Sequence, residues 1–167
     1  MMAFTNTVSN GVELWILDIE TKAVKKISDA NLNANTGMPF SWFKDSNSLL
    51  VKVISKNKKP LIDTKTAVPT GPTISVSEQG VKAQNRTYQD LLKNKSDEHN
   101  FEQLTLAELY KVDLNGNKTL WKGNDMYRSL SFSPDGNYIL IITIEKPFSY
   151  LVPYSRFPSK TTIYKAG

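Results

Sequence analysis

The sequence has no cysteine, and histidine occurs in it once, as His99. Disulfide bonds, cysteine nucleophiles and cysteine-based metal sites are therefore excluded. His99 lies in the polar stretch 96–100, beside Asp97 and Glu98, and is interpreted as a solvated surface residue rather than a catalytic base. We predict no metal site and no cofactor, because one histidine and a pair of carboxylates are too small a ligand set for a calcium loop.

Long apolar runs are also missing. The longest, residues 138–144, has the length of a strand and falls far short of a membrane span, so we predict no membrane partner. The first residues, Met-Met-Ala-Phe, have neither a basic region nor a long apolar region, and we recognise no signal peptide in this chain.

Sequence motifs for chemistry are absent as well. The chain contains no Gly-x-Ser-x-Gly nucleophile elbow and no glycine-rich phosphate cradle. We therefore predict that this chain is not an enzyme by itself.

The charge balance is basic, with a formal net charge of +5 and a pI of about 9.3. Such a balance can indicate nucleic-acid binding. The lysines are scattered, however, and the tightest group, Lys56, Lys58 and Lys59, is interpreted as a solvated turn. Aromatic and basic residues do not alternate on one strand face, so we predict no nucleic-acid partner.

Two segments recur in the same order along the chain. Residues 13–19 (Glu-Leu-Trp-Ile-Leu-Asp-Ile) match residues 108–114 (Glu-Leu-Tyr-Lys-Val-Asp-Leu). Residues 41–51 match residues 131–141, each beginning with Ser-aromatic and ending in an apolar run. The second copy of this segment contains Ser-Pro-Asp-Gly-Asn, which favours a tight turn between strands. Such an internal repeat indicates a repeat architecture.

Each repeat predicts four short antiparallel strands, the pattern of a propeller blade. We therefore predict an all-β fold with a small helical element: a partial β-propeller of about two four-stranded antiparallel blades. The aromatic residues at matching strand positions are predicted to lie in the core: Trp15, Trp42, Tyr110 and Phe132.

Residues 1–167 are predicted to form a single partial propeller domain, with a loop-rich insert at 55–103. The two copies are spaced at about twice the 40 to 50 residues of a usual blade, which requires such an insert. Within it we expect a short strand at 74–76 and helical turns at 87–92. Residues 96–98 are compatible with a helix cap, but a strand that begins near Phe101 and continues into Tyr110 is the preferred interpretation.

The chain is also predicted to begin and end in the middle of a blade. Residues 2–6 have the pattern of a second blade strand, and residues 162–164 that of a third. A propeller cut in this way has open sheet edges, so self-association is a further expectation.

The blade motifs, Leu-Tyr-x-Val-Asp followed by Ser-Phe-Ser-Pro-Asp-Gly-Asn-Tyr, resemble those of the prolyl oligopeptidase family of serine peptidases and of TolB-like propellers. The insert narrows the resemblance to glutamyl-endopeptidase-like members. The segments that carry it are 64–72 (Thr-Lys-Thr-Ala-Val-Pro-Thr-Gly-Pro), 84–92 (Gln-Asn-Arg-Thr-Tyr-Gln-Asp-Leu-Leu) and 147–158 (Pro-Phe-Ser-Tyr-Leu-Val-Pro-Tyr-Ser-Arg-Phe-Pro).

This resemblance implies an N-terminal propeller that covers a C-terminal α/β-hydrolase domain and limits which peptides reach its serine. The expected partners are that hydrolase domain of the parent chain and a peptide substrate. The parent is expected to be bacterial and secreted or periplasmic. The alternative is a TolB-like propeller that binds protein partners with no enzyme attached.

One stretch is a candidate for substrate binding. Residues 147–158 combine proline, aromatic residues and Arg156, so a stiff loop can present the guanidinium to a carboxylate of a peptide. Tyr154 belongs to the same stretch, and Arg86 in the insert is a further candidate. A surface arginine on a connection between blades is the alternative for Arg156.

Overall fold

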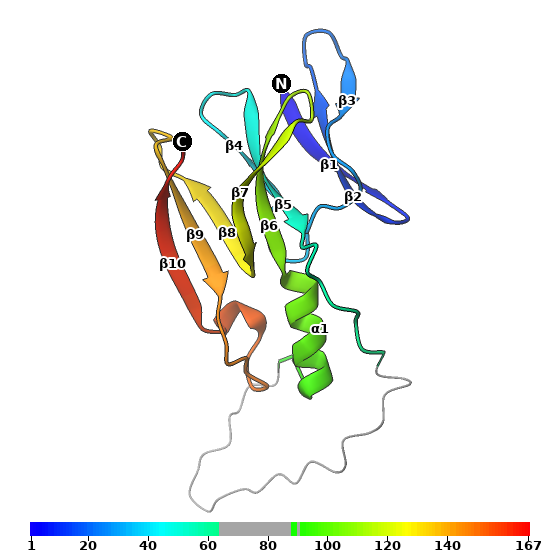
Figure 1. Ribbon diagram of the computed structural model, residues 1–167, viewed down its shortest axis with the longest axis vertical. Helices are drawn as coiled ribbons and strands as arrows, with labels where there is room; N and C mark the ends of the chain where they lie inside the picture. The colour runs from blue at the N-terminus through cyan, green and yellow to red at the C-terminus, as the bar shows by residue number, and fades with distance from the viewer. Residues whose placement is uncertain (64–87, 90) are drawn as a thin grey trace, which may run out of the picture.

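The computed structural model describes residues 1–63, 88–89 and 91–167. Its strands form three antiparallel sheets (Figure 1). The first is three-stranded, with order β1 (Met2–Val8), β2 (Gly11–Leu17), β3 (Val24–Lys26). The second is four-stranded, with order β4 (Phe40–Trp42), β5 (Ser48–Ile54), β6 (Ala107–Asp113), β7 (Lys118–Asp125). The third is three-stranded, formed by β8 (Tyr127–Phe132), β9 (Tyr138–Ile144) and β10 (Ser159–Lys165).

The predicted all-β class is thus confirmed. The strands are spread over one four-stranded sheet and two three-stranded neighbours rather than over two four-stranded sheets. The expected strand at 74–76, residues 87 and 90 of the expected helical turns, and Arg86 lie outside the described residues. The helical turns are wrong for the described residues 88–89 and 91–92, which have no helical structure; the helix begins later, at Lys95.

The two copies of the repeat occupy equivalent positions in neighbouring sheets. Trp42 pairs with Leu49 across β4 and β5, and Phe132 pairs with Ile139 across β8 and β9. The turns between these strands match as well. Gly136 has φ 69° in the third sheet, and Ser46 adopts φ 54° at the same place in the second. Serine replaces the glycine that this left-handed position favours, yet the turn keeps its geometry.

The hydrophobic core lies between the sheets, in two layers. The first and second sheets enclose a cluster that includes Leu14, Leu49 and Val51. The second and third enclose another that includes Leu109 and Tyr127. Since alternate residues of a strand face opposite sides, the second sheet contributes to both layers.

Trp15 corrects one core prediction. Its neighbours Leu14 and Ile16 belong to the first core layer, but Trp15 is only partly buried and belongs to none of the clusters. Its indole N–H donates to Glu13 at 2.8 Å. The physical reason is that Trp15 points to the outer face of the first sheet, which no other described sheet covers. Tyr110, at the matching position of the second sheet, is buried in the first core layer.

The preferred strand beginning at Phe101 is wrong. Residues Lys95–Thr105 form α1, and β6 begins only at Ala107. Asn94 is the N-cap, because its side chain accepts from the backbone N–H of Asp97 at 2.9 Å. Asp97 and Glu98 follow in the first turn, where negative charge stabilises a helix. These local signals outweigh the strand pattern of the apolar residues that follow.

A buried lysine connects the second and third sheets. Lys52 of β5 is 1% exposed, and its ammonium donates to the backbone oxygen of Thr36. The hydroxyl of Thr36 in turn donates to the backbone oxygen of Tyr127 at 2.8 Å. Burial lowers the pKa of Lys52 to about 8. The loop that contains Thr36 therefore joins the core of one sheet to the first strand of the next.

Candidate functional site: the face around α1 and the 145–158 loop

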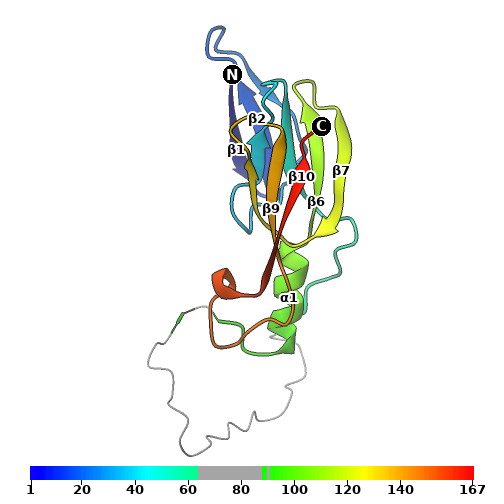
Figure 2. The same ribbon diagram turned by 90° about the vertical axis from the view of Figure 1, so that its left-hand side faces the viewer.

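Two inter-strand connections meet at one end of the sheets. The first contains α1 and joins β5 to β6, and the second joins β9 to β10 through η1 (Tyr154–Arg156). Both views show these connections projecting from the same end (Figures 1 and 2). They occupy the same place in consecutive sheets, so the repeat itself brings them together. We call this end the α1 face.

An aromatic cluster fixes the two connections to each other. The ring of Phe101 on α1 lies 5.1 Å from that of Phe148 and 5.5 Å from that of Phe157, both edge-on. Phe148 and Phe157 stack at 5.4 Å. Beneath them lie Met126 and Ile144, both buried. Aromatic packing of this kind adds about 0.5–1.5 kcal/mol per pair beyond area burial, so the 145–158 loop is held against α1.

The structure places two of the three predicted site residues together. Tyr154 and Arg156 lie on η1 and are exposed, and the ring of Tyr154 is 6.1 Å from that of Phe101. The guanidinium carbon of Arg156 lies 5.6 Å from the ring centre of Tyr88. Arg86 lies outside the described residues, so the structure does not place it.

Tyr88 was not singled out as a site residue from the sequence. Its hydroxyl is buried and, among the described residues, has no hydrogen-bond partner. Tyr88 contacts Arg156, which is distant in sequence. A sequence pattern within one segment does not reveal such a contact.

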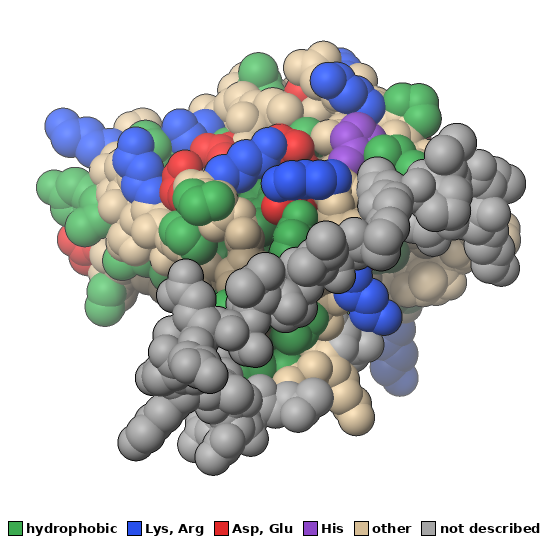
Figure 3. Space-filling view, turned by 90° about the horizontal axis from the view of Figure 1, so that it is seen from below, with side chains coloured by type: hydrophobic (Ala, Val, Ile, Leu, Met, Phe, Trp, Pro, Cys, Tyr) green, Lys and Arg blue, Asp and Glu red, His purple; other side chains and the backbone are tan. Residues whose placement is uncertain are grey.

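Two ion pairs lie on the α1 face. Lys146 forms an ion pair with Glu102 at 2.8 Å, and Lys95 with Glu98 at 2.9 Å. The hydrogen bond from Lys95 lowers the pKa of Glu98 and raises that of Lys95. Figure 3 shows basic and acidic side chains side by side on this face. In the described part of the chain, no carboxylate forms an ion pair with Arg156.

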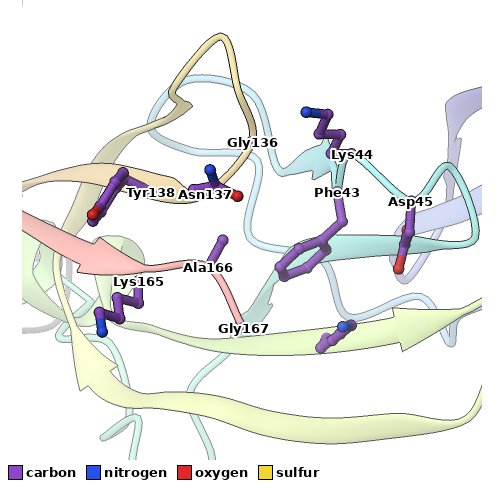
Figure 4. Close-up of a pocket in the computed structure, with 10 residues that line it drawn as sticks. Phe43, Lys44, Asp45, Gly136, Asn137, Tyr138, Lys165, Ala166 and Gly167 are labelled. Atoms are coloured by element: carbon purple, nitrogen blue, oxygen red, sulfur yellow. The ribbon is translucent and has the colours of Figure 1, made fainter.

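A cavity of about 470 Å³ lies at the opposite end of the molecule. It is formed by the turns around Lys44 and Gly136 and by the residues after β10 (Figure 4). The ring of Phe43 points into it, whereas Lys44 and Lys165 point away. Lys111 also lines the cavity, and its Nζ lies 4.6 Å from the ring centre of Phe43. Because two of the three lysines point away from the cavity, the cations do not converge on one anion site.

His99 is not arranged as a catalytic base in the described chain. Its Nε2 lies 3.0 Å from the backbone oxygen of Pro60, a contact between a ring N–H and a carbonyl. Among the described residues, no group of acidic, histidine or cysteine side chains is placed to hold a metal ion. No helix in the described ranges is long and apolar enough to span a bilayer.

No protein-family model matches the sequence. Two curated plant proteins do, both named "Probable glutamyl endopeptidase, chloroplastic". The chain is 32% identical to the one from Oryza sativa subsp. japonica over 163 residues, covering 95% of this chain. It is 33% identical to the one from Arabidopsis thaliana over 159 residues, covering 90% of this chain. This chain is homologous to a segment of the glutamyl endopeptidases.

The predicted resemblance is thereby confirmed. The chain spans 17% and 16% of the length of the two plant relatives. Among solved structures, the acylaminoacyl peptidase of Pyrococcus horikoshii matches 99% of this chain and 22% of its own, with 16% identity and a TM-score of 0.49. The chloroplast location belongs to the plant proteins by name, and the bacterial, secreted or periplasmic parent stays a prediction.

Proposed function

We propose that this chain is a non-catalytic propeller segment of a larger serine peptidase, in which it shapes the access of peptides to a hydrolase domain. The observation that carries the proposal is its identity of 32% and 33% to named endopeptidases, of which it covers 17% and 16%. Two further observations agree with it. Equivalent strands recur in neighbouring sheets, and the sequence has no nucleophile elbow.

The outer faces of the first and third sheets support a larger parent fold. Met2, Val24 and Ile163 are 51%, 53% and 65% exposed on strands of these sheets. Met2 and Val24 both lie opposite Leu17 in the first sheet, and Ile163 lies opposite Leu140 in the third. Apolar side chains on an open sheet face are compatible with coverage by further structure. In the parent we assign these faces to neighbouring parts of the same chain, and in the isolated chain they favour self-association.

Arg156 is the residue that we propose contacts the peptide. It is exposed, it has no ion-pair partner among the described residues, and the aromatic cluster fixes the loop that carries it. A guanidinium stacked over a ring keeps its fork of N–H groups free for a carboxylate. The ligand that fits is an acidic peptide side chain or a C-terminal carboxylate, held by a bidentate pair.

The test compares Arg156→Ala with Arg156→Lys in the full-length parent, using matched peptides with a glutamate or a glutamine at the same position. A lost charge-assisted pair is worth about 1.5–3 kcal/mol, so we expect kcat/KM for the acidic peptide to fall roughly 10- to 100-fold in Arg156→Ala. Arg156→Lys is expected to restore it only in part, since lysine lacks the planar fork. Equal losses on both peptides would remove Arg156 from the site.

A second test reads the gene downstream of the codon for Gly167. We expect a Gly-x-Ser-x-Gly motif several hundred residues further on, followed by an aspartate and a histidine. A stop codon soon after the ring is completed would instead support a binding module without an enzyme.

A further inference from the structure

The side of α1 carries a row of polar side chains that bind the backbone of another segment. The row consists of His99, Asn100 and Gln103, and it holds residues 59–62, which we call the strap. The backbone N–H of Lys59 donates to Oε1 of Gln103 at 2.7 Å. The Nε2 contact of His99 with the oxygen of Pro60 completes the pattern along the same stretch.

Asn100 forms two hydrogen bonds with the backbone of a single strap residue. Its Oδ1 accepts from the backbone N–H of Ile62 at 2.7 Å, and its Nδ2 donates to the backbone oxygen of the same residue at 2.8 Å. One amide side chain thus satisfies both backbone groups of one residue, as a neighbouring strand does for every second residue. Any residue except proline offers the same pair of groups, so the row recognises an extended backbone rather than a particular side chain.

The strap is held by solvent-exposed hydrogen bonds and not by buried apolar contacts. Leu61 and Ile62 are 46% and 37% exposed, and neither belongs to a hydrophobic cluster. The bonds between Asn100 and Ile62 are themselves exposed to solvent. Segments with few buried apolar contacts and solvent-exposed hydrogen bonds open at low free energy. The strap is therefore exchangeable, while Gln103, 5% exposed, and the rest of α1 stay in place.

We propose that this row is a docking track for an extended polypeptide backbone, which the strap occupies when no other polypeptide is bound. The proposal rests on the proposed function, in which the chain belongs to a peptidase and Arg156 on the same α1 face contacts a peptide. Phe101 of α1 packs on Phe148, Tyr154 and Phe157, so the helix that carries the row also contacts the loop that carries Arg156.

The test uses a fluorescent synthetic peptide with the sequence of residues 58–64 of this chain and measures its binding by anisotropy. In Ile62→Pro the strap lacks the N–H that Asn100 accepts, so the track is more often open. Because apparent affinity scales with the open fraction, we expect the peptide to bind at least tenfold more tightly to this variant than to the unmodified chain. Ile62→Ala keeps the N–H and serves as the matched control, with unchanged affinity.

The same assay includes Asn100→Leu and Asn100→Asp in the Ile62→Pro background, with circular dichroism to verify the helix. Asn100→Leu is expected to weaken binding at least tenfold, and Asn100→Asp, which accepts but does not donate, to weaken it less. A peptide with proline in place of Ile62 is expected not to bind. The proposal would be overturned if the peptide bound the Asn100 variants as tightly as Ile62→Pro alone. It would also be overturned if Ile62→Pro showed no saturable binding up to millimolar peptide. The assay measures binding and not catalysis, so its outcome does not decide whether the parent is a peptidase; the tests given under the proposed function do.

Discussion

Replacing Lys52 with methionine probes the contact between the second and third sheets. Lys52 is 1% exposed and donates to the backbone oxygen of Thr36, and no described carboxylate forms an ion pair with it. Burial lowers its pKa from 10.5 to about 8. Lys52→Met keeps the approximate length and volume of the side chain and removes the buried charge.

The direction of the pH effect follows from the two pKa values. The folded state binds this proton more weakly than the unfolded state, so protonated Lys52 costs stability. The cost is present in full below pH 8 and disappears as the pH rises from about 8 to 10.5. This lowering of the pKa corresponds to about 3 kcal/mol, most of which is recovered between pH 7 and pH 10.

The assay is urea unfolding of both proteins at several pH values between 7 and 10. The difference in unfolding free energy, Lys52→Met minus unmodified chain, is expected to fall by roughly 2–3 kcal/mol across this range. At pH 7 the gain from removing the charge is partly offset by about 1–3 kcal/mol, because the oxygen of Thr36 loses its donor. Lys44→Met, at an exposed lysine, is the control and should show no such trend. A difference that stays constant with pH would refute the reasoning.

Other expectations concern the turns, the helix and the candidate site. Ser46→Gly places glycine at φ 54° and is expected to raise stability by up to about 1 kcal/mol in urea unfolding, whereas the neighbouring Asn47→Gly should not. Asn94→Ala removes the N-cap of α1 and is expected to cost about 1 kcal/mol, with Asn94→Ser close to the unmodified chain. In the proposed parent peptidase, Tyr88→Ala is expected to raise KM for acidic peptides. Tyr88→Phe keeps the ring over Arg156 and loses only a buried hydroxyl that has no partner among the described residues, so KM is expected to stay unchanged. An equal KM in both Tyr88 variants would contradict an orienting role.

The repeat was predictable because its signals are local. Turn residues and alternating apolar residues specify each strand within a few positions, and the match of Trp42 with Phe132 required only their sequence context. The error at Phe101 was local too. The stretch from Phe101 to Tyr110 has enough apolar residues for a strand. However, the N-cap at Asn94 and the acidic first turn favour a helix, which extends to Thr105 and so includes the first part of this stretch.

Burial depends instead on which surfaces meet in the fold. For this reason Trp15 is more exposed, and Lys52 more buried, than the residue type alone suggests. Trp15 and Tyr110 occupy matching positions, but only Tyr110 has a neighbouring sheet over it. Lys52 interrupts a run of valines and leucines, and the loop carrying Thr36 covers it. The same holds for the candidate site. Composition made Arg156 and Tyr154 candidates, but the contact of Arg156 with Tyr88 and the hydrogen bonds of α1 to residues 59–62 join segments far apart in the chain.

The most direct test of the account is labelling with a serine-directed fluorophosphonate, applied to this chain and to the full-length parent, followed by mass spectrometry of the labelled peptide. The account predicts that the chain alone is unlabelled and that the parent carries the label on one serine outside residues 1–167. A labelled serine within residues 1–167, or a correctly folded parent that is not labelled at all, would contradict it.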